Sequence, residues 1–138
     1  MRIPSDWRGA IIGKTPATSD SSVTAVPSAK RPTPLPVKVE RWDPEKDGKF
    51  SEAALRRKIE KQGCRVSRYV YPPGTYFSDH THEIDKIDAV VSGRFRMKMK
   101  GFEVVLEAGD SLEVPRGTIH SAEVVGNEPV VSLDAARA

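Results

Sequence analysis

The sequence predicts an all-β fold with one short helix near its beginning, and three observations lead to this prediction. From Cys64 onward apolar and polar residues tend to alternate, and a period of two is typical of strands with one buried face. Gly, Pro and Asn interrupt this pattern at roughly every 8–12 residues, a spacing typical of β-sandwiches and barrels. Only residues 52–62 have the character of a helix.

Each element follows from local signals. Residues 37–42 alternate like a short initial strand, and residues 43–48 contain the residues of a turn. The helix is predicted to begin after Ser51, a good N-cap, and to end at Gly63, which tolerates the left-handed conformation of a C′ residue. The predicted strands then span residues 64–71, 76–81, 87–92, 94–100, 102–106, 111–114, 120–125 and 130–134.

The composition indicates one folded domain after a distinct leader. Residues 1–36 are rich in Pro, Ser and Thr, and we expect a flexible basic leader because such a segment buries too little apolar surface to offset the entropy of ordering it. Residues 37–138 then form a single domain. The net charge of +3 belongs to the leader region, since the last 100 residues carry 16 Lys and Arg against 17 Asp and Glu.

This charge distribution argues against a nucleic-acid partner, because the folded part is slightly acidic and offers no basic recognition face. No apolar run approaches the ~20 residues that span a bilayer, so no membrane partner is expected. The chain has one cysteine, Cys64, which has no partner for an internal disulfide, and no signal sequence is evident. We therefore expect a cytoplasmic protein.

The three histidines are the strongest functional signal. His80 and His82 are two residues apart, so on a strand their side chains point to the same face. His120 begins a later predicted strand, after a Pro-x-Gly turn. Imidazole nitrogens bind Zn, Cu, Fe and Ni, so three histidines that converge would form a metal site.

Around these histidines the sequence resembles the cupin superfamily, in its small single-domain, RmlC-like form. The first cupin motif, G-x5-H-x-H-x3,4-E-x6-G, is matched in spacing by Gly74, His80, His82, Lys86 and Gly93. The second, G-x5-P-x-G-x2-H-x3-N, is matched in spacing by Gly109, Pro115, Gly117, His120 and Val124. The resemblance covers roughly residues 64–135.

The resemblance implies a double-stranded β-helix, a jelly-roll barrel, with His80, His82 and His120 as ligands of one divalent transition metal. Fe(II) is the first choice, and Zn, Ni, Mn or Cu are the alternatives. It also implies a homodimer with a small-molecule ligand. Family activities include oxygenases, isomerases, lyases and decarboxylases, and dioxygenase is our first choice. The alternative is a non-enzymatic cupin that binds or senses a small ligand or sugar.

Two residues depart from the motifs: Lys86 stands in place of the ligand Glu, and Val124 in place of Asn. An ammonium at ~4 Å from a unit positive charge is repelled by ~4 kcal/mol at an effective dielectric constant near 20. Three arrangements are open: Lys86 turns away to pair with Glu83, Asp85 or Asp88; it stays in the site as an anion-binding or acid–base group; or no metal binds and the histidines line a ligand pocket.

Asp88 is the second candidate catalytic residue beside Lys86. The two residues lie two apart on a predicted strand and so face the same way. Asp88 is expected to neutralise Lys86, because a buried ammonium usually has a partner, and less readily to supply the missing oxygen ligand.

Overall fold

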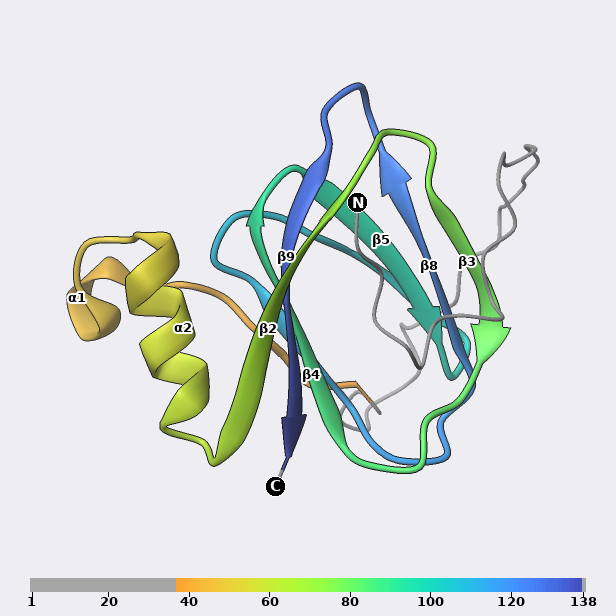
Figure 1. The fold of residues 1–138 in the computed structure, drawn as a ribbon, viewed down its shortest axis with the longest axis horizontal. Coiled ribbons are helices and arrows are strands. Elements are labelled where there is room, and N and C mark those ends of the chain that lie inside the picture. The colour runs from red at the N-terminus through yellow and green to blue at the C-terminus, as the bar shows by residue number, and fades with distance from the viewer. Residues whose placement is uncertain (1–36, 138) are drawn as a thin grey trace, which may run out of the picture.

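The computed structural model describes residues 37–137 as two antiparallel sheets that face each other (Figure 1). The predicted leader, residues 1–36, lies outside the described residues. One sheet has five strands in the order β1-β7-β4-β9-β2 and the other has four in the order β3-β8-β5-β6. Consecutive strands therefore alternate between sheets along much of the chain, which is the jelly-roll arrangement expected of a double-stranded β-helix.

The five-stranded sheet is formed by strands from both ends of the described chain. Its central strand β4 pairs with β7 on one side and with β9 on the other. The short strand β1 adds to β7, and β2 adds to β9 in a continuous register from Cys64↔Arg137 to Tyr71↔Val130. The strand bounds are β1 Val39–Glu40, β2 Cys64–Tyr71, β4 Lys86–Ser92, β7 Ser111–Val114 and β9 Val130–Arg137.

The four-stranded sheet carries two of the histidines. Strand β8 lies between β3 and β5, and β6 forms the far edge. The β5–β6 hairpin turns through Lys100 and Gly101, which both have positive φ, as a two-residue type I′ turn requires. The strand bounds are β3 Tyr76–His80, β5 Arg94–Met99, β6 Phe102–Leu106 and β8 His120–Val125.

Two helices lie between β1 and β2 in the chain. Helix α1, Pro44–Asp47, is a single turn capped by the Asp43 side chain, with Pro44 in the first turn. Helix α2, Glu52–Glu60, is capped by Ser51 and lies on the outside of the barrel next to β2 (Figure 1). Its buried residues Leu55 and Ile59 join an apolar cluster with outward-facing residues of the five-stranded sheet.

The barrel interior is a second apolar cluster. Tyr71, Phe77 and Phe95 meet there with ring centroids 5.0–6.3 Å apart, in edge-to-face and stacked contacts. Along β4 the side chains alternate: Val90 belongs to this interior cluster, whereas Ile87 and Ala89 pack outside with α2. The even-numbered residues Lys86 and Asp88 therefore face the interior.

The predicted fold class is confirmed, and the differences lie at element boundaries. The turn region 43–48 contains the one-turn helix α1, because Asp43 caps it and Pro44 suits its first turn. The initial strand is reduced to two residues, and the strand predicted over 76–81 ends at His80. Strand β9 runs on to Arg137 because β2 and β4 both pair with its last residues.

Neither helix in the described part of the chain has the length and apolar character needed to cross a bilayer.

Candidate metal centre

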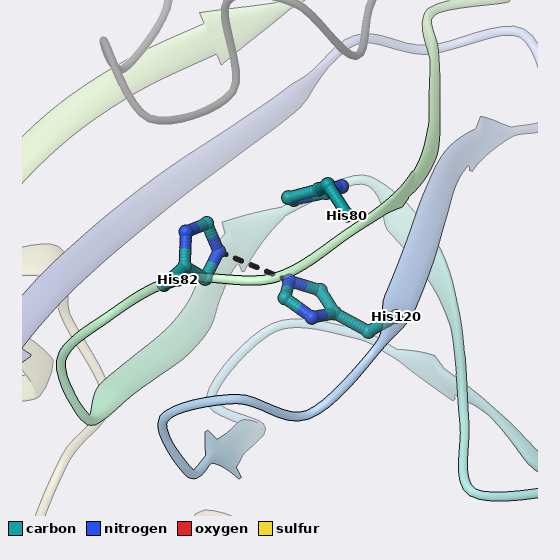
Figure 2. A group of neighbouring side chains, drawn as sticks. All are labelled: His80, His82 and His120. Atoms are coloured by element: carbon teal, nitrogen blue, oxygen red, sulfur yellow. Dashed lines mark hydrogen bonds between the residues drawn. The ribbon is translucent and has the colours of Figure 1, made fainter.

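The three histidines converge from two neighbouring segments of the barrel (Figure 2). His80 is the last residue of β3 and pairs in register with His120, the first residue of β8. His82 lies in the loop after β3, so its position beside His80 does not come from regular strand alternation as predicted. The ring centroids are 4.9 Å apart for His80 and His82, 4.3 Å for His80 and His120, and 4.7 Å for His82 and His120.

The nitrogen positions fit a single metal ion. One nitrogen from each ring lies within 4.8 Å of the corresponding nitrogens of the other two. The Nε2 atoms of His82 and His120 are 3.1 Å apart. Two imidazole ligands at ~2.1 Å from one ion have nitrogens about 3.0–3.4 Å apart for right-angled to tetrahedral geometry. This pair, which forms a hydrogen bond (Figure 2), has the spacing that two ligands of one ion require.

Backbone carbonyls orient two of the rings. His80 Nδ1 lies 2.6 Å from the Ser78 carbonyl oxygen, and His120 Nδ1 lies 2.9 Å from the Thr118 carbonyl oxygen. A carbonyl only accepts, so in each ring Nδ1 carries the proton and Nε2 presents its lone pair. Hydrogen bonds of this kind fix the tautomer and ring orientation of metal-binding histidines. Both rings are thus prepared to bind a cation through Nε2.

Hydrogen bonds between loops hold the histidine segments together. The Gly117 amide donates to the His82 carbonyl over 2.9 Å. The Arg116 amide donates to Asp85 Oδ1 over 2.8 Å. The turn that leads into β8 is therefore attached to the loop that carries His82, and the Pro-x-Gly sequence serves to position His120. Asp85, one of the predicted partners of Lys86, is used in this attachment.

Burial keeps His120 neutral. Desolvation lowers the pKa of His120 to about 4, and the nearby charges of His80, His82 and Lys86 act in the same direction, while the hydrogen bond to Thr118 opposes them. A metal binds neutral imidazole, so a histidine that does not bind a proton near neutral pH needs no deprotonation before it binds the metal.

Lys86 lies inside the barrel, with a relative exposure of 5%. Its Nζ forms an ion pair with Asp134 Oδ2 at 2.8 Å. Lys86 therefore does not turn outward to Glu83 or Asp85. Its ammonium lies in the interior, and the partner shown there, Asp134, was not among the expected ones. Asp134 brings an opposite charge beside Lys86, which would offset the repulsion between this lysine and a bound metal.

Asp88 is also buried and shares the inner face with Lys86. It lies directly opposite Asp134 in the register between β4 and β9. Both carboxylates are close to Tyr71, whose pKa is raised first by burial and then by the charges of Asp88 and Asp134. The five-stranded sheet thus presents a group of three buried charged residues to the interior: Lys86, Asp88 and Asp134. Val124, at the position of the motif Asn, is instead part of the apolar core.

Sequence reasoning missed Asp134. It stands at the end of the predicted strand 130–134, and alternation along that strand places it on the same face as Val130, which is in the interior core. The signal that was needed is the pairing of β9 with β4, which connects residues 48 positions apart in the sequence. Alternation within one strand does not reveal such a partner.

Comparison with known proteins agrees with this architecture. A family profile described as "Cupin domain" matches residues 67–135. A relative from Branchiostoma floridae, described as bifunctional lysine-specific demethylase and histidyl-hydroxylase NO66, is 39% identical over 61 residues, which cover 41% of this chain and 10% of that protein. The chain therefore matches about one tenth of the length of this curated relative.

Similar solved structures include DMSP lyases, at 26% identity and a TM-score of 0.50, with 56% of this chain and 40% of the other covered. Another is an RmlC-like cupin from Shewanella frigidimarina, at 26% identity and a TM-score of 0.48, with 54% and 65% covered. The family profile spans half of the chain and includes all three histidines. The chain therefore belongs to the cupin superfamily.

Proposed function

We propose that this cupin is a metal-dependent enzyme that acts on a small organic molecule, with one divalent transition metal held by His80, His82 and His120. The observation that supports this most strongly is the convergence of the three histidines, with nitrogens within 4.8 Å of one another. A lone buried histidine is commonly a core residue. Three on adjacent segments, two of them oriented by backbone carbonyls, are better explained as ligands.

Fe(II) is our first choice of metal and dioxygenase our first choice of reaction. Three protein ligands leave three positions of an octahedral ion open, which suits a metal that binds both substrate and oxygen. The relative described as a histidyl-hydroxylase supports oxygen chemistry in a protein with a similar segment. Zn, Ni, Mn and Cu are the alternative metals, and with them a Lewis-acid reaction such as isomerisation or lyase chemistry would replace oxidation.

We propose that Lys86 and Asp88 are the charged groups that act on the bound molecule. Both are buried on the inner face of the five-stranded sheet, across the interior from the sheet that carries His120. Buried charged groups beside a metal are suited to orienting a polar substrate or moving a proton.

Metal loading tests this proposal. Untagged protein would be stripped with a chelator, reconstituted with Fe(II), Co(II), Ni(II) or Zn(II), desalted and measured by elemental analysis. We expect about one equivalent of metal in the wild type and a loss of affinity by orders of magnitude in His120→Ala. Thr81→Ala is the matched control, because Thr81 stands between two of the histidines but is exposed. It should load like the wild type.

The oxygenase class is tested by nitric oxide, an analogue of dioxygen. If the Fe(II) protein has open positions, nitric oxide should produce the electron paramagnetic resonance signal of a high-spin iron–nitrosyl complex. Less than about a tenth of an equivalent of every metal after reconstitution would contradict the metal site. Full loading with iron but no reaction with nitric oxide would contradict the dioxygenase assignment and leave the metal site intact.

The second candidate is a non-enzymatic cupin that binds or senses a small ligand or sugar. Lys86 favours it, because this residue replaces the acidic ligand of the first cupin motif and is held by Asp134 inside the barrel. A protein that binds metal and ligand but consumes neither oxygen nor ligand under multiple-turnover conditions would support this candidate.

A further inference from the structure

The polar group on the inner face of the five-stranded sheet contains an acceptor that sequence reasoning did not identify. Asp134 has a relative exposure of 7%. Its Oδ2 accepts from Lys86 Nζ at 2.8 Å. Its Oδ1 is buried and accepts no hydrogen bond from any residue in the described part of the chain. A buried carboxylate oxygen in this state costs free energy unless a donor is supplied from elsewhere.

The location of Asp134 shows where such a donor could come from. Its neighbours along β9, Leu133 and Ala135, pack outside with α2, so Asp134 points into the barrel. His120, on the opposite sheet, faces the same interior. The Lys86 charge is close enough to His120 to contribute to the lowered pKa of that histidine. The ion pair and the histidine cluster are therefore parts of one interior region.

A ligand in this region meets different chemistry on its two sides. The histidine side, with a metal, attracts an oxygen with negative or partial negative charge. On the opposite side, Asp134 Oδ1 is an acceptor without a donor among the described residues, so it selects an N–H or O–H group. Lys86 and Asp134 neutralise each other and so add no net charge against the metal. A small molecule that satisfies both sides carries an anionic oxygen and a hydrogen-bond donor close together.

We propose that Asp134 is a ligand-binding residue whose Oδ1 accepts a hydrogen bond from the substrate, and that the substrate is a small carboxylic acid with a hydroxyl or amino group next to the carboxylate. Lys86, proposed above to act on the bound molecule, also holds Asp134 in this orientation. The inference deepens the proposed function and rests on its metal site.

The test uses Co(II)-substituted protein, whose visible spectrum reports both metal binding and changes in the metal's coordination. The protein would be titrated with L-lactate and with propionate, which has the same carbon skeleton and carboxylate but lacks the hydroxyl. We expect the wild type to bind L-lactate about tenfold or more tightly than propionate, as a hydrogen bond to a charged group implies.

The variant Asp134→Asn changes the shape little but replaces one accepting oxygen with a donating NH2 group; because Lys86 donates to the remaining oxygen, the NH2 group would face the ligand. It should bind Co(II) normally and lose the preference for L-lactate. If the preference for L-lactate came only from chelation of the metal by its hydroxyl, the preference would persist in this variant. Asp110→Asn is the matched control. Asp110 is a buried aspartate paired with Arg41, before the start of β7, and its replacement should leave the preference unchanged.

A second variant covers the case in which Asp134→Asn does not fold. Lys86→Met combined with Asp134→Leu removes both members of the ion pair, so neither is left buried without the other. It should bind Co(II) and bind L-lactate and propionate alike.

The outcomes distinguish this inference from the proposed function. If one equivalent of Co(II) binds but the wild type does not prefer L-lactate, or either variant keeps the preference, Asp134 has no such role and the metal site stands. If Co(II) does not bind to the wild type, the metal site fails and this inference fails with it.

Discussion

At the scale of single residues, the site is defined by how each polar group in the barrel is satisfied. His80 and His120 each donate a hydrogen bond from Nδ1 to a backbone carbonyl and so direct Nε2 inward. Lys86 and Asp134 pair with each other, with side-chain exposures of 4% and 9%. Charges buried this deeply require a partner, because desolvation of an isolated ion costs several kcal/mol. The histidines and the ion pair therefore respond differently to mutation.

The metal-free protein should lose stability as the pH falls from about 6.5 to about 4. The pKa of His120 falls from 6.5 to about 4 on folding, so in this range the unfolded chain binds a proton that the folded chain does not. The contribution lost is on the order of 2–3 kcal/mol. Urea denaturation at pH 7.5 and pH 4.5, with chelator present, measures it. His120→Asn should show a smaller pH dependence, and equal dependence in both proteins would contradict this origin.

Lys86→Met should destabilise the protein by about 3–5 kcal/mol, because Asp134 would remain buried without its cation. Replacing both residues together, as Lys86→Met with Asp134→Leu, should restore part of this loss, because Asp134 is then no longer buried without its cation, while Asp88 stays buried on the same face. Chemical denaturation of the wild type and the two variants measures the difference. Wild-type stability in the single variant would show that the pair contributes nothing in the interior.

At the scale of elements, the corner between β4 and β5 carries the chain from one sheet to the other. Gly93 occupies it with a φ of +85°, and a Cβ at this position would lie 2.3 Å from the Pro129 carbonyl oxygen, directly before β9. The contact is with backbone, so no side-chain movement relieves it. Gly101, in the β5–β6 hairpin, has a similar φ of +78° but no atom within 4 Å of such a Cβ.

Gly93→Ala should therefore cost more than Gly101→Ala. The positive φ alone costs roughly 1–2 kcal/mol for an alanine, which is the effect expected at Gly101. At Gly93 the backbone clash adds to it, and we expect a total loss of about 3 kcal/mol or more. Thermal or urea unfolding of both variants gives the comparison. Equal losses would mean that the close approach of β4 to β9 at this corner is not a constraint.

At the scale of the whole molecule, the barrel is asymmetric. The five-stranded sheet is covered on its outer face by α2 and on its inner face by the barrel core. On the four-stranded sheet, the outward-facing residues Arg94 and Lys98 of β5 are exposed. The polar interior groups come from both sheets, with the histidine cluster on one side and the Lys86–Asp134 pair on the other. The site therefore forms only when the two sheets come together in the closed barrel.

The strands and the three histidines could be predicted from the sequence, but two features of the site could not. Alternation and turn residues located most of the barrel strands, and the motif spacing identified the three histidines. The exceptions required tertiary information. His82 lies beside His80 because its loop is attached to the turn before β8, and not because of strand alternation. Asp134 is connected to Lys86 through the register of β9 with β4, which no local pattern encodes.

The central claim is that one divalent metal binds among His80, His82 and His120 inside the barrel. X-ray diffraction from crystals of the metal-loaded protein, recorded above and below the absorption edge of the metal, tests it most directly. We predict a single anomalous peak per chain within ~2.0–2.2 Å of one nitrogen from each of the three histidines. A peak elsewhere in a fully loaded protein, or a loaded crystal in which one of these histidines is not a ligand, would contradict the claim.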